Sequence, residues 1–212
     1  MGRNSLTRPG VGPHVTEQQE YEVLETHGSL ERRRYAACVV ADVAVGGSVE
    51  GAGTAAFRPL VSYISGANLR RGAFTTAMAP DASGERMAMT APVIQQAADD
   101  GAEDRWIVSF VLPGGRDVDD YPEPTDPRVR LRALPAHEAA AIRWSGRWSA
   151  DNVATRTEEL RRALDQHGWV AVAQARWARF DPPWKPAFLR RNEIVIPVDS
   201  SSAANRNEPT LP

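Results

Sequence analysis

The regular segments predicted along this chain follow one order twice, and this repetition limits the folds that the sequence can adopt. Each half has strand segments, then one amphipathic helix, then two further strands. The first half comprises strands at 31–45, 87–96 and 106–112, and the second comprises strands at 129–143, 170–180 and 193–198. One helix among several strands per half favours an α+β fold over an alternating βαβ fold.

Two segments have the apolar spacing of amphipathic helices. The first covers about 49–65, ends before Gly66, and has an apolar stripe formed by Phe57, Leu60, Val61 and Ile64. The second covers about 151–167, ends at Gly168, and has an apolar stripe formed by Val153, Thr157, Leu160 and Leu164. Glu158 and Arg162 are spaced to form an i,i+4 ion pair on the second helix.

The segment joining the two halves is short and rich in proline (YPEPTDP, 121–127), so it does not resemble a flexible interdomain linker. We therefore predict one domain at 19–198, made of two similar halves (about 19–120 and 121–198) that share a sheet system with pseudo-twofold symmetry. The polar, Gly- and Pro-rich ends, 1–18 and 199–212, are predicted to be disordered tails.

Composition excludes several classes of protein. A 42% apolar content is typical of a globular core, and a net charge of −2 argues against a nucleic-acid partner. The single cysteine, Cys38, allows no intrachain disulfide and is predicted to be a buried structural thiol. No apolar run approaches the ~20 residues of a membrane span, and the N-terminus lacks the apolar core of a signal peptide. We expect a soluble, cytoplasmic protein.

Motifs that carry catalysis or bind metals are missing. The sequence has no G-x-S-x-G, no phosphate-binding loop, no H-E-x-x-H and no C-x-x-C. The four histidines, at His14, His27, His137 and His167, have no metal-ligand spacing and are expected to face solvent. No metal site and no catalytic residue are therefore predicted.

Three other segments have features of a ligand surface, and each has an ordinary structural alternative. Residues 87–93 (MAMTAPV) suit a flat apolar ligand, or alternatively core packing. Residues 181–186 (DPPWKP) followed by 190–193 (RRNE) combine a stiff aromatic loop with cations, as a porphyrin with propionates requires, or alternatively form local salt bridges. Residues 66–71 (GANLRR) add two cations, or alternatively form a solvated turn.

These segments also resemble the SOUL heme-binding protein family over nearly the whole core. The matching signatures are YEVLETHGSLERRRY, FRPLVSYISGAN, MAMTAPVI, VSFVLP, YPEPTDPRVRLRALP and FDPPWKPAFLRRNEIVIPV. The resemblance implies a twisted eight-stranded antiparallel barrel-like sheet with two flanking helices, built from two similar halves. It also implies a shape related to the GyrI-like regulatory ligand-binding domains.

The resemblance implies roles for particular residues. The histidine proposed as an iron ligand in some members is replaced here by Arg34, which cannot serve as an ordinary heme ligand, so no histidine ligand is predicted. In other members the porphyrin lies against the first helix and a lysine of the P-P-x-K-P loop reaches a propionate. The matching positions are Phe57 and Val61 on the helix and Lys185 in the loop.

The basic residues that such members use on the first helix match Thr54 and Ser62 here, and Arg70 and Arg71 are the cations expected to compensate. An insertion at about 74–85 follows this turn and either covers the site or decorates it.

Three functions from different classes follow. The leading one is non-covalent binding of heme or another tetrapyrrole, as a carrier or buffer and not as an enzyme. The alternative is a GyrI-like binding module for another small amphipathic ligand, an analogy of fold alone. The last is a hydrolase that uses a pocket carboxylate such as Glu193, for which the sequence supplies no nucleophile and base pair.

Overall fold

The structure is a computed structural model that describes residues 17–70, 84–99 and 101–199. The two predicted tails lie almost wholly outside the described residues, as do Arg71 and most of the predicted insertion at 74–85. The two predicted helices are present with closely similar bounds, at Val49–Ile64 (α1) and Ala150–His167 (α2). Each begins after a serine, Ser48 or Ser149, whose side chain accepts a hydrogen bond from a first-turn amide.

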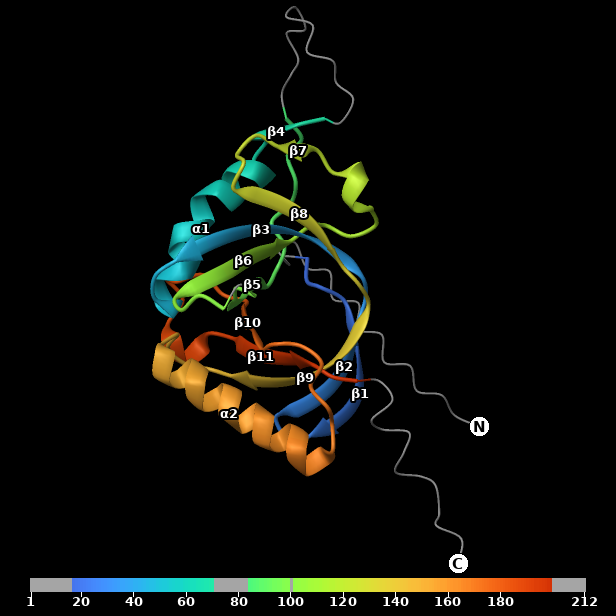
Figure 1. Cartoon of the computed structure of the whole chain (residues 1–212), viewed down its shortest axis with the longest axis vertical. Coiled ribbons are helices and arrows are strands. Elements are labelled where there is room, and N and C mark those ends of the chain that lie inside the picture. The colour runs from blue at the N-terminus through green and yellow to red at the C-terminus, as the bar shows by residue number, and fades with distance from the viewer. Residues whose placement is uncertain (1–16, 71–83, 100, 200–212) are drawn as a thin grey trace, which may run out of the picture.

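Strands make up most of the remaining regular structure (Figure 1). In chain order they are β1 (Tyr21–His27), β2 (Leu30–Tyr35), β3 (Cys38–Gly46), β4 (Asn68–Leu69), β5 (Val93–Ala97), β6 (Arg105–Val111), β7 (Glu123–Pro124), β8 (Val129–Leu134), β9 (His137–Trp144), β10 (Arg176–Arg179) and β11 (Asn192–Pro197). Two short 3-10 helices, η1 (Val118–Asp120) and η2 (Ala187–Leu189), lie in loops.

Nine of these strands form one antiparallel sheet in the order β1-β2-β9-β11-β10-β5-β6-β3-β8, while β4 and β7 pair separately. The ladder between β5 and β10 joins β1-β2-β9-β11-β10 to β5-β6-β3-β8, and each of these two parts contains strands from both halves of the chain. The predicted α+β fold with a large antiparallel sheet and two helices is therefore confirmed.

The predicted eight-stranded barrel differs from what is observed. The sheet curls but has nine strands, and no ladder between described residues joins the end strands β1 and β8. The sheet is therefore open. Strands that correspond in the two halves of the chain lie at the same distance from the centre of the sheet. Counted outward from the centre, the strand order is β5-β6-β3-β8 on one side and β10-β11-β9-β2 on the other. Pseudo-twofold symmetry stays a prediction.

Both helices cover the outer face of the curled sheet (Figure 1). A row of directly paired residues runs across this face and includes Val43, Val108, Trp177, Ile194 and Ile142. The first two pack with α1 in one core cluster, and the last three pack with α2 in another. The inner face, which alternates with this one along every strand, supports no helix among the described residues.

Some element boundaries differ from the prediction for local reasons. The segment predicted as a strand at 87–96 joins the sheet only from Val93, after Pro92, which has no amide proton to donate, while Ala91 forms an isolated bridge with Gln18. The amide groups of Met87 and Ala91 instead donate to Ile64 of α1 and to Glu17. The segment predicted at 170–180 is regular only in β10. Neither α1 nor α2 combines the length and the apolar content that crossing a bilayer requires, in the part of the chain described.

Candidate ligand-binding surfaces

The first candidate surface is the solvent-facing side of α1. Phe57 was predicted to belong to the apolar stripe, but its side chain is 47% exposed and only the ring edge meets Phe110, with 6.0 Å between ring centroids. Val61 is half-buried and packs against the core. The buried stripe is instead formed by Val49, Ala52, Gly53, Ala56, Pro59, Leu60, Tyr63 and Ile64. Phe57 therefore presents an aromatic surface to solvent.

The same side of α1 holds a cation that the sequence analysis did not single out. Arg58 is exposed and has no ion-pair partner among the described residues. It lies four residues from both Thr54 and Ser62, so the three share one face of the helix. Arg58 thus supplies positive charge between the two positions at which family members have basic residues.

The proline-rich loop after β10 is held rigid by its own polar groups. The Asp181 carboxylate accepts hydrogen bonds from the Lys185 ammonium and from the Arg191 amide, both at 2.6 Å. The Arg190 guanidinium donates to the backbone carbonyl of Lys185 at 2.7 Å and to that of Pro183. Lys185 consequently has a carboxylate partner already, whereas Arg190 bonds only to neutral carbonyls within the described chain.

This loop displays large apolar side chains to solvent. Trp184 is 83% exposed, Phe188 is 73% exposed and Leu189 is 54% exposed. The loop starts after Arg179 of β10. Arg179 pairs with Val93 of β5, and Val93 pairs with Phe110 of β6. Two strand spacings, about 10 Å, therefore separate Arg179 from Phe110, the residue that Phe57 contacts. The loop therefore begins near the N-terminal half of α1 (Figure 1).

The other predicted binding residues lie elsewhere. Arg70 is exposed and follows β4, at the opposite end of α1 from the proline-rich loop (Figure 1). Arg71 lies outside the described residues. In the methionine-rich segment Met87 packs against the core while Met89 is 46% exposed, so the alternative of core packing holds for Met87.

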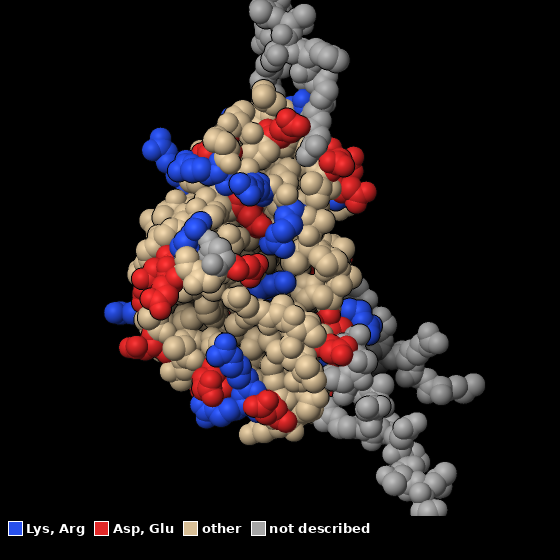
Figure 2. Space-filling model, in the orientation of Figure 1, with Lys and Arg blue, Asp and Glu red and all other residues tan. Residues whose placement is uncertain are grey.

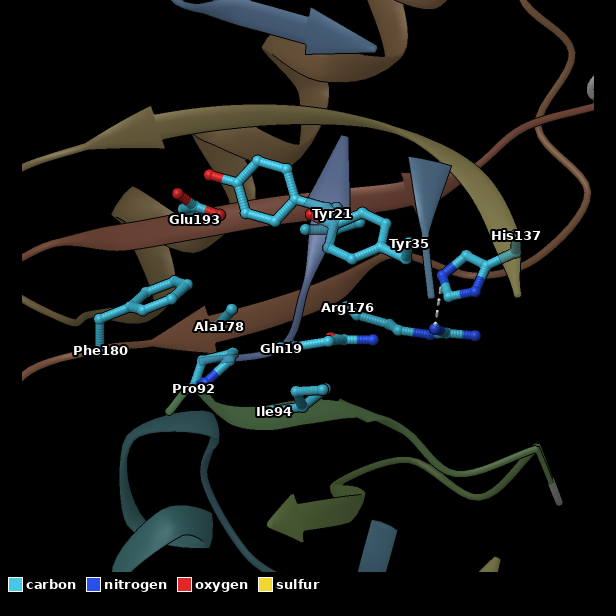
Figure 3. A pocket seen from close by; sticks show the side chains of 11 residues that line it. Gln19, Tyr21, Tyr35, Pro92, Ile94, His137, Arg176, Ala178, Phe180 and Glu193 are labelled. Atoms are coloured by element: carbon cyan, nitrogen blue, oxygen red, sulfur yellow. Dashed lines mark hydrogen bonds between the residues drawn. The ribbon is translucent and has the colours of Figure 1, made fainter. Parts of the chain in front are cut away.

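The second candidate surface is a small cavity on the inner face of the sheet (Figure 3). It has a volume of about 30 Å³, which is enough for one or two waters or a carboxylate group. One wall is aromatic: the rings of Tyr21 and Tyr35 are 5.3 Å apart, and Tyr35 stacks on His137 at 5.3 Å. Apolar side chains complete the lining, namely Pro92, Ile94, Ala178, Phe180 and Val195.

Glu193 lies at one end of this cavity and is neutralised by two arginines. Its carboxylate is 1% exposed and accepts hydrogen bonds from Arg33 at 2.6 Å and from Arg191 at 2.6 Å. Burial alone would lower the pKa of the Arg33 guanidinium, but the hydrogen bonds that it donates to Glu193 and Tyr35 and the electrostatic attraction of these two groups together outweigh burial and raise that pKa. Burial also raises the pKa of Tyr35 to about 12. With both oxygens engaged, Glu193 is poorly placed to act as a general base.

A different charge arrangement lies at the other end of the cavity. The Arg176 guanidinium donates to His137 Nε2 at 3.3 Å, and His137 Nδ1 lies 2.8 Å from the Pro135 carbonyl oxygen. A guanidinium can only donate, so Nε2 is the acceptor and Nδ1 is the protonated nitrogen. Burial lowers the pKa of His137 and also that of Arg176.

A larger cavity of about 300 Å³ adjoins this end. Gln19 lines both cavities and donates to the Cys38 thiol at 3.4 Å. Cys38 is half-buried and not fully buried as predicted, and its partial burial raises its pKa. The rim of the larger cavity includes Glu17 and Glu20.

The remaining histidines and Arg34 take part in surface contacts. His27 and His167 stack at 4.2 Å, beside Trp169, although 140 residues separate them. Arg34 is exposed and pairs with Glu22 and Glu138. Among the described residues no group of three His, Cys, Asp or Glu side chains is placed to hold a metal ion. His14 lies outside those residues.

Sequence analysis missed the inner cavity and its residues Tyr21, Tyr35, His137 and Arg176. The only local signal for these four residues is Arg176 itself, an arginine inside the otherwise apolar stretch 175–178. Apolar periodicity predicts that such an arginine faces solvent. Over the face shown in Figure 2, acidic and basic side chains are interspersed and neither sign forms a continuous patch. This face therefore has no continuous basic patch.

Comparison with known proteins gives a family and a fold. Residues 16–197 match the family model described as SOUL heme-binding protein. No curated protein matches the chain. The C-terminal domain of EcmrR is similar in structure, with a TM-score of 0.57 at 13% identity over 84% of this chain and 98% of that chain.

Two further structures have the same fold. EcmrR in a complex with DNA has a TM-score of 0.50 at 15% identity over 80% of this chain and 57% of that chain. A protein described as a hydrolase from Listeria innocua has a TM-score of 0.53 at 13% identity over 83% of this chain and 94% of that chain. At these identities the similarity extends to the fold alone.

Proposed function

Because the chain belongs to the SOUL heme-binding protein family, we propose that it binds heme or another tetrapyrrole non-covalently on the outer surface of α1, as a carrier or buffer. The observation that best supports this site is the apolar surface left open there. Phe57 on α1 and Trp184 and Phe188 in the rigid loop expose aromatic rings that a flat apolar ring system would cover.

The charges around this surface fit the propionates of a porphyrin. Arg58 and Arg190 have no carboxylate partner among the described residues, while Lys185 shares its charge with Asp181. We assign Arg58, Arg190 and Lys185 to the propionates and Phe57 and Val61 to the ring face. Arg70 is assigned to the opposite end of the helix, and the predicted Arg71 lies outside the described residues. Exposed ion pairs between these cations and the propionates of the ligand would orient the ligand more than they tighten its binding.

No protein histidine is expected to be essential for this binding. Arg34 occupies the position of the histidine proposed as a ligand in other members, and it is engaged by Glu22 and Glu138. His137 lies on the inner face, while His27 and His167 stack on each other. A tetrapyrrole held by its ring face and its propionates requires none of them. We propose binding without catalysis and a cytoplasmic location.

Hemin titration followed by absorbance tests this function. We expect Phe57→Asp to abolish most binding, because it places an unpaired carboxylate against the ring face. Lys185→Ala and Arg58→Ala should each weaken binding by roughly 1 kcal/mol, about fivefold. Arg161→Ala, which removes an exposed arginine from α2, is the matched control and should change nothing.

Bound hemin should also quench tryptophan fluorescence, because Trp184 lies in the loop that borders the site. Circular dichroism must show that each variant is folded. If folded Phe57→Asp binds hemin as the parent does, the outer surface of α1 is not the site. If any His→Ala variant loses binding, the mode of ligation is wrong.

The alternative is a module that binds another small amphipathic molecule. The two inner-face cavities favour this function, and the fold shared with the EcmrR C-terminal domain is compatible with it. A protein that gives no Soret change with hemin but binds a smaller amphipathic ligand would support the alternative.

A further inference from the structure

Arg176 is half-buried, and no carboxylate among the described residues lies within ion-pair distance of it. Its side chain lines the inner cavity, and its single hydrogen bond among the described residues goes to a neutral imidazole, His137 Nε2, at 3.3 Å. A guanidinium has five N–H donors, so most of those of Arg176 have no protein acceptor there. A half-buried charge without a charged partner has lost part of its hydration, and an anion from outside the protein would offset that cost.

The other charges near the cavity already balance each other. Glu193 is shared by Arg33 and Arg191, and Arg33 also pairs with Glu31 at 2.7 Å. Asp42 is paired with Arg132 at 2.7 Å. The positive charge of Arg176 is therefore the one left over, and it lies at the end of the cavity away from Glu193 (Figure 3). An added monoanion would balance it.

The volumes and linings indicate what kind of anion fits. The cavity of about 30 Å³ beside Arg176 accommodates a carboxylate group but no larger body. Across Gln19 lies the cavity of about 300 Å³, whose lining includes Cys38, Val111 and Leu112. Its lining also includes the polar residues Gln18 and Thr90 and two acidic residues, Glu17 and Glu20, so an uncharged tail is favoured there and a second carboxylate is disfavoured.

We propose that the inner face of the sheet is a binding site for small aliphatic monocarboxylic acids. The carboxylate receives hydrogen bonds from Arg176, and the tail passes Gln19 into the larger cavity. The site is separate from the proposed tetrapyrrole surface, because Ala178 and Ile94 face inward while the neighbouring Arg179 and Val93 face the helices.

A set of six-carbon probes tests the charge and the shape on the unmodified protein. Hexanoate, hexanamide, hexylamine and adipate are titrated by calorimetry at neutral pH. We expect hexanoate to bind at least about tenfold more tightly than hexanamide, the gain from charge-assisted hydrogen bonds to a guanidinium. Hexylamine should not bind, and adipate should bind more weakly than hexanoate because of Glu17 and Glu20. Equal binding of hexanoate and hexanamide would overturn the proposal.

Variants locate the carboxylate. Arg176→Gln should weaken hexanoate binding about tenfold and leave hexanamide binding unchanged, a difference that a merely structural role would not produce. Arg130→Gln removes an exposed arginine from β8 of the same sheet and is the matched control, with no expected effect. If Arg176→Gln does not fold by circular dichroism, Arg176→Lys keeps the charge and should retain part of the preference for hexanoate.

A second variant tests the route of the tail. Gln19→Ala removes the partition between the cavities and should tighten hexanoate binding; weaker binding would contradict the route. Hexanoate should not displace hemin. Because hexanoate and hemin are assigned to different sites, a lack of hexanoate binding would contradict only the monocarboxylate site. A lack of hemin binding would contradict only the tetrapyrrole site.

Discussion

At the scale of single residues, the Glu193 carboxylate is the most constrained polar group described. It is 1% exposed and is neutralised by Arg33 of β2, 160 positions away, and by Arg191 of the loop before β11, 2 positions away. The Arg33 guanidinium also lies over the Tyr21 ring at 4.3 Å. This set ties β2 to β11, although these strands are not neighbours in the sheet.

Glu193→Gln should lower the free energy of unfolding by about 3 kcal/mol. The substitution keeps the shape but leaves the buried charge of Arg33 without its main partner, which costs more than the pair itself contributes. Urea denaturation measures the change. Glu22→Gln, at an exposed partner of Arg34, is the matched control and should change stability little. A similar small change for Glu193→Gln would show that the buried pair is not needed.

His137 gives a second residue-scale prediction, concerning pH. Because burial and Arg176 lower its pKa in the folded protein, the unfolded chain takes up a proton first as the pH falls below about 6.5. Stability should therefore decrease as the pH falls from about 6.5 through the lower folded pKa. In His137→Asn, which can still donate to the Pro135 carbonyl, this part of the pH dependence should disappear.

The melting temperature measured between pH 7.5 and pH 5.5 checks this prediction, with His27→Asn as the control outside the cavity. Identical pH slopes for the parent and His137→Asn would contradict the assigned cause.

At the scale of elements, the guanidinium of Arg179 from β10 lies directly against α1 at Gly53. A Cβ added there would lie 1.7 Å from the Arg179 guanidinium, which is mostly buried and lies 4.9 Å from the Trp148 ring. At Gly51 an added Cβ would lie 3.4 Å from the Ser48 hydroxyl, an ordinary contact. The same glycine-to-alanine change therefore has opposite consequences two residues apart.

Gly51→Ala should be neutral or stabilise by up to about 1 kcal/mol, as alanine does in a helix, whereas Gly53→Ala should destabilise by about 1 kcal/mol. In an Arg179→Ala background the contact is gone, and Gly53→Ala should then stabilise. Thermal unfolding of the parent, Gly53→Ala, Arg179→Ala and the double variant forms a double-mutant cycle. Additive effects of Gly53→Ala and Arg179→Ala would show that the close approach has no energetic role.

At the scale of the whole molecule, the ladder between β5 and β10 joins two parts of one sheet, each with its own helix and core cluster and each built from both halves of the chain. Leu60 of α1 and Leu160 of α2 hold equivalent places, both with 0% exposure. Because no boundary divides the sheet, damage to either core should be felt throughout.

We expect Leu60→Ala and Leu160→Ala each to cost about 3 kcal/mol and each to leave a single unfolding transition. Five of the six tryptophans belong to the second half, so their fluorescence reports on that half, while circular dichroism reports on both. For Leu60→Ala, in the first half, the two signals should share one midpoint. Separate midpoints would show that the halves unfold independently.

The sequence by itself determined the local structure and the family. Apolar periodicity placed both helices within about one residue, and the repeated order of elements predicted one α+β domain. The motif strings predicted the family that residues 16–197 match. These features are encoded locally, because spacing along a helix or strand fixes which face each residue occupies.

Only the tertiary structure decided which distant side chains meet. Strand order brings Arg33 to Glu193 and Arg176 to His137, and it leaves the end strands unpaired instead of closing a barrel. The packing of α1 decided that Phe57 faces outward beside Arg58, although periodicity placed Phe57 in the buried stripe. Such contacts depend on which strands become neighbours and in which register, and periodicity within a segment contains no information about either.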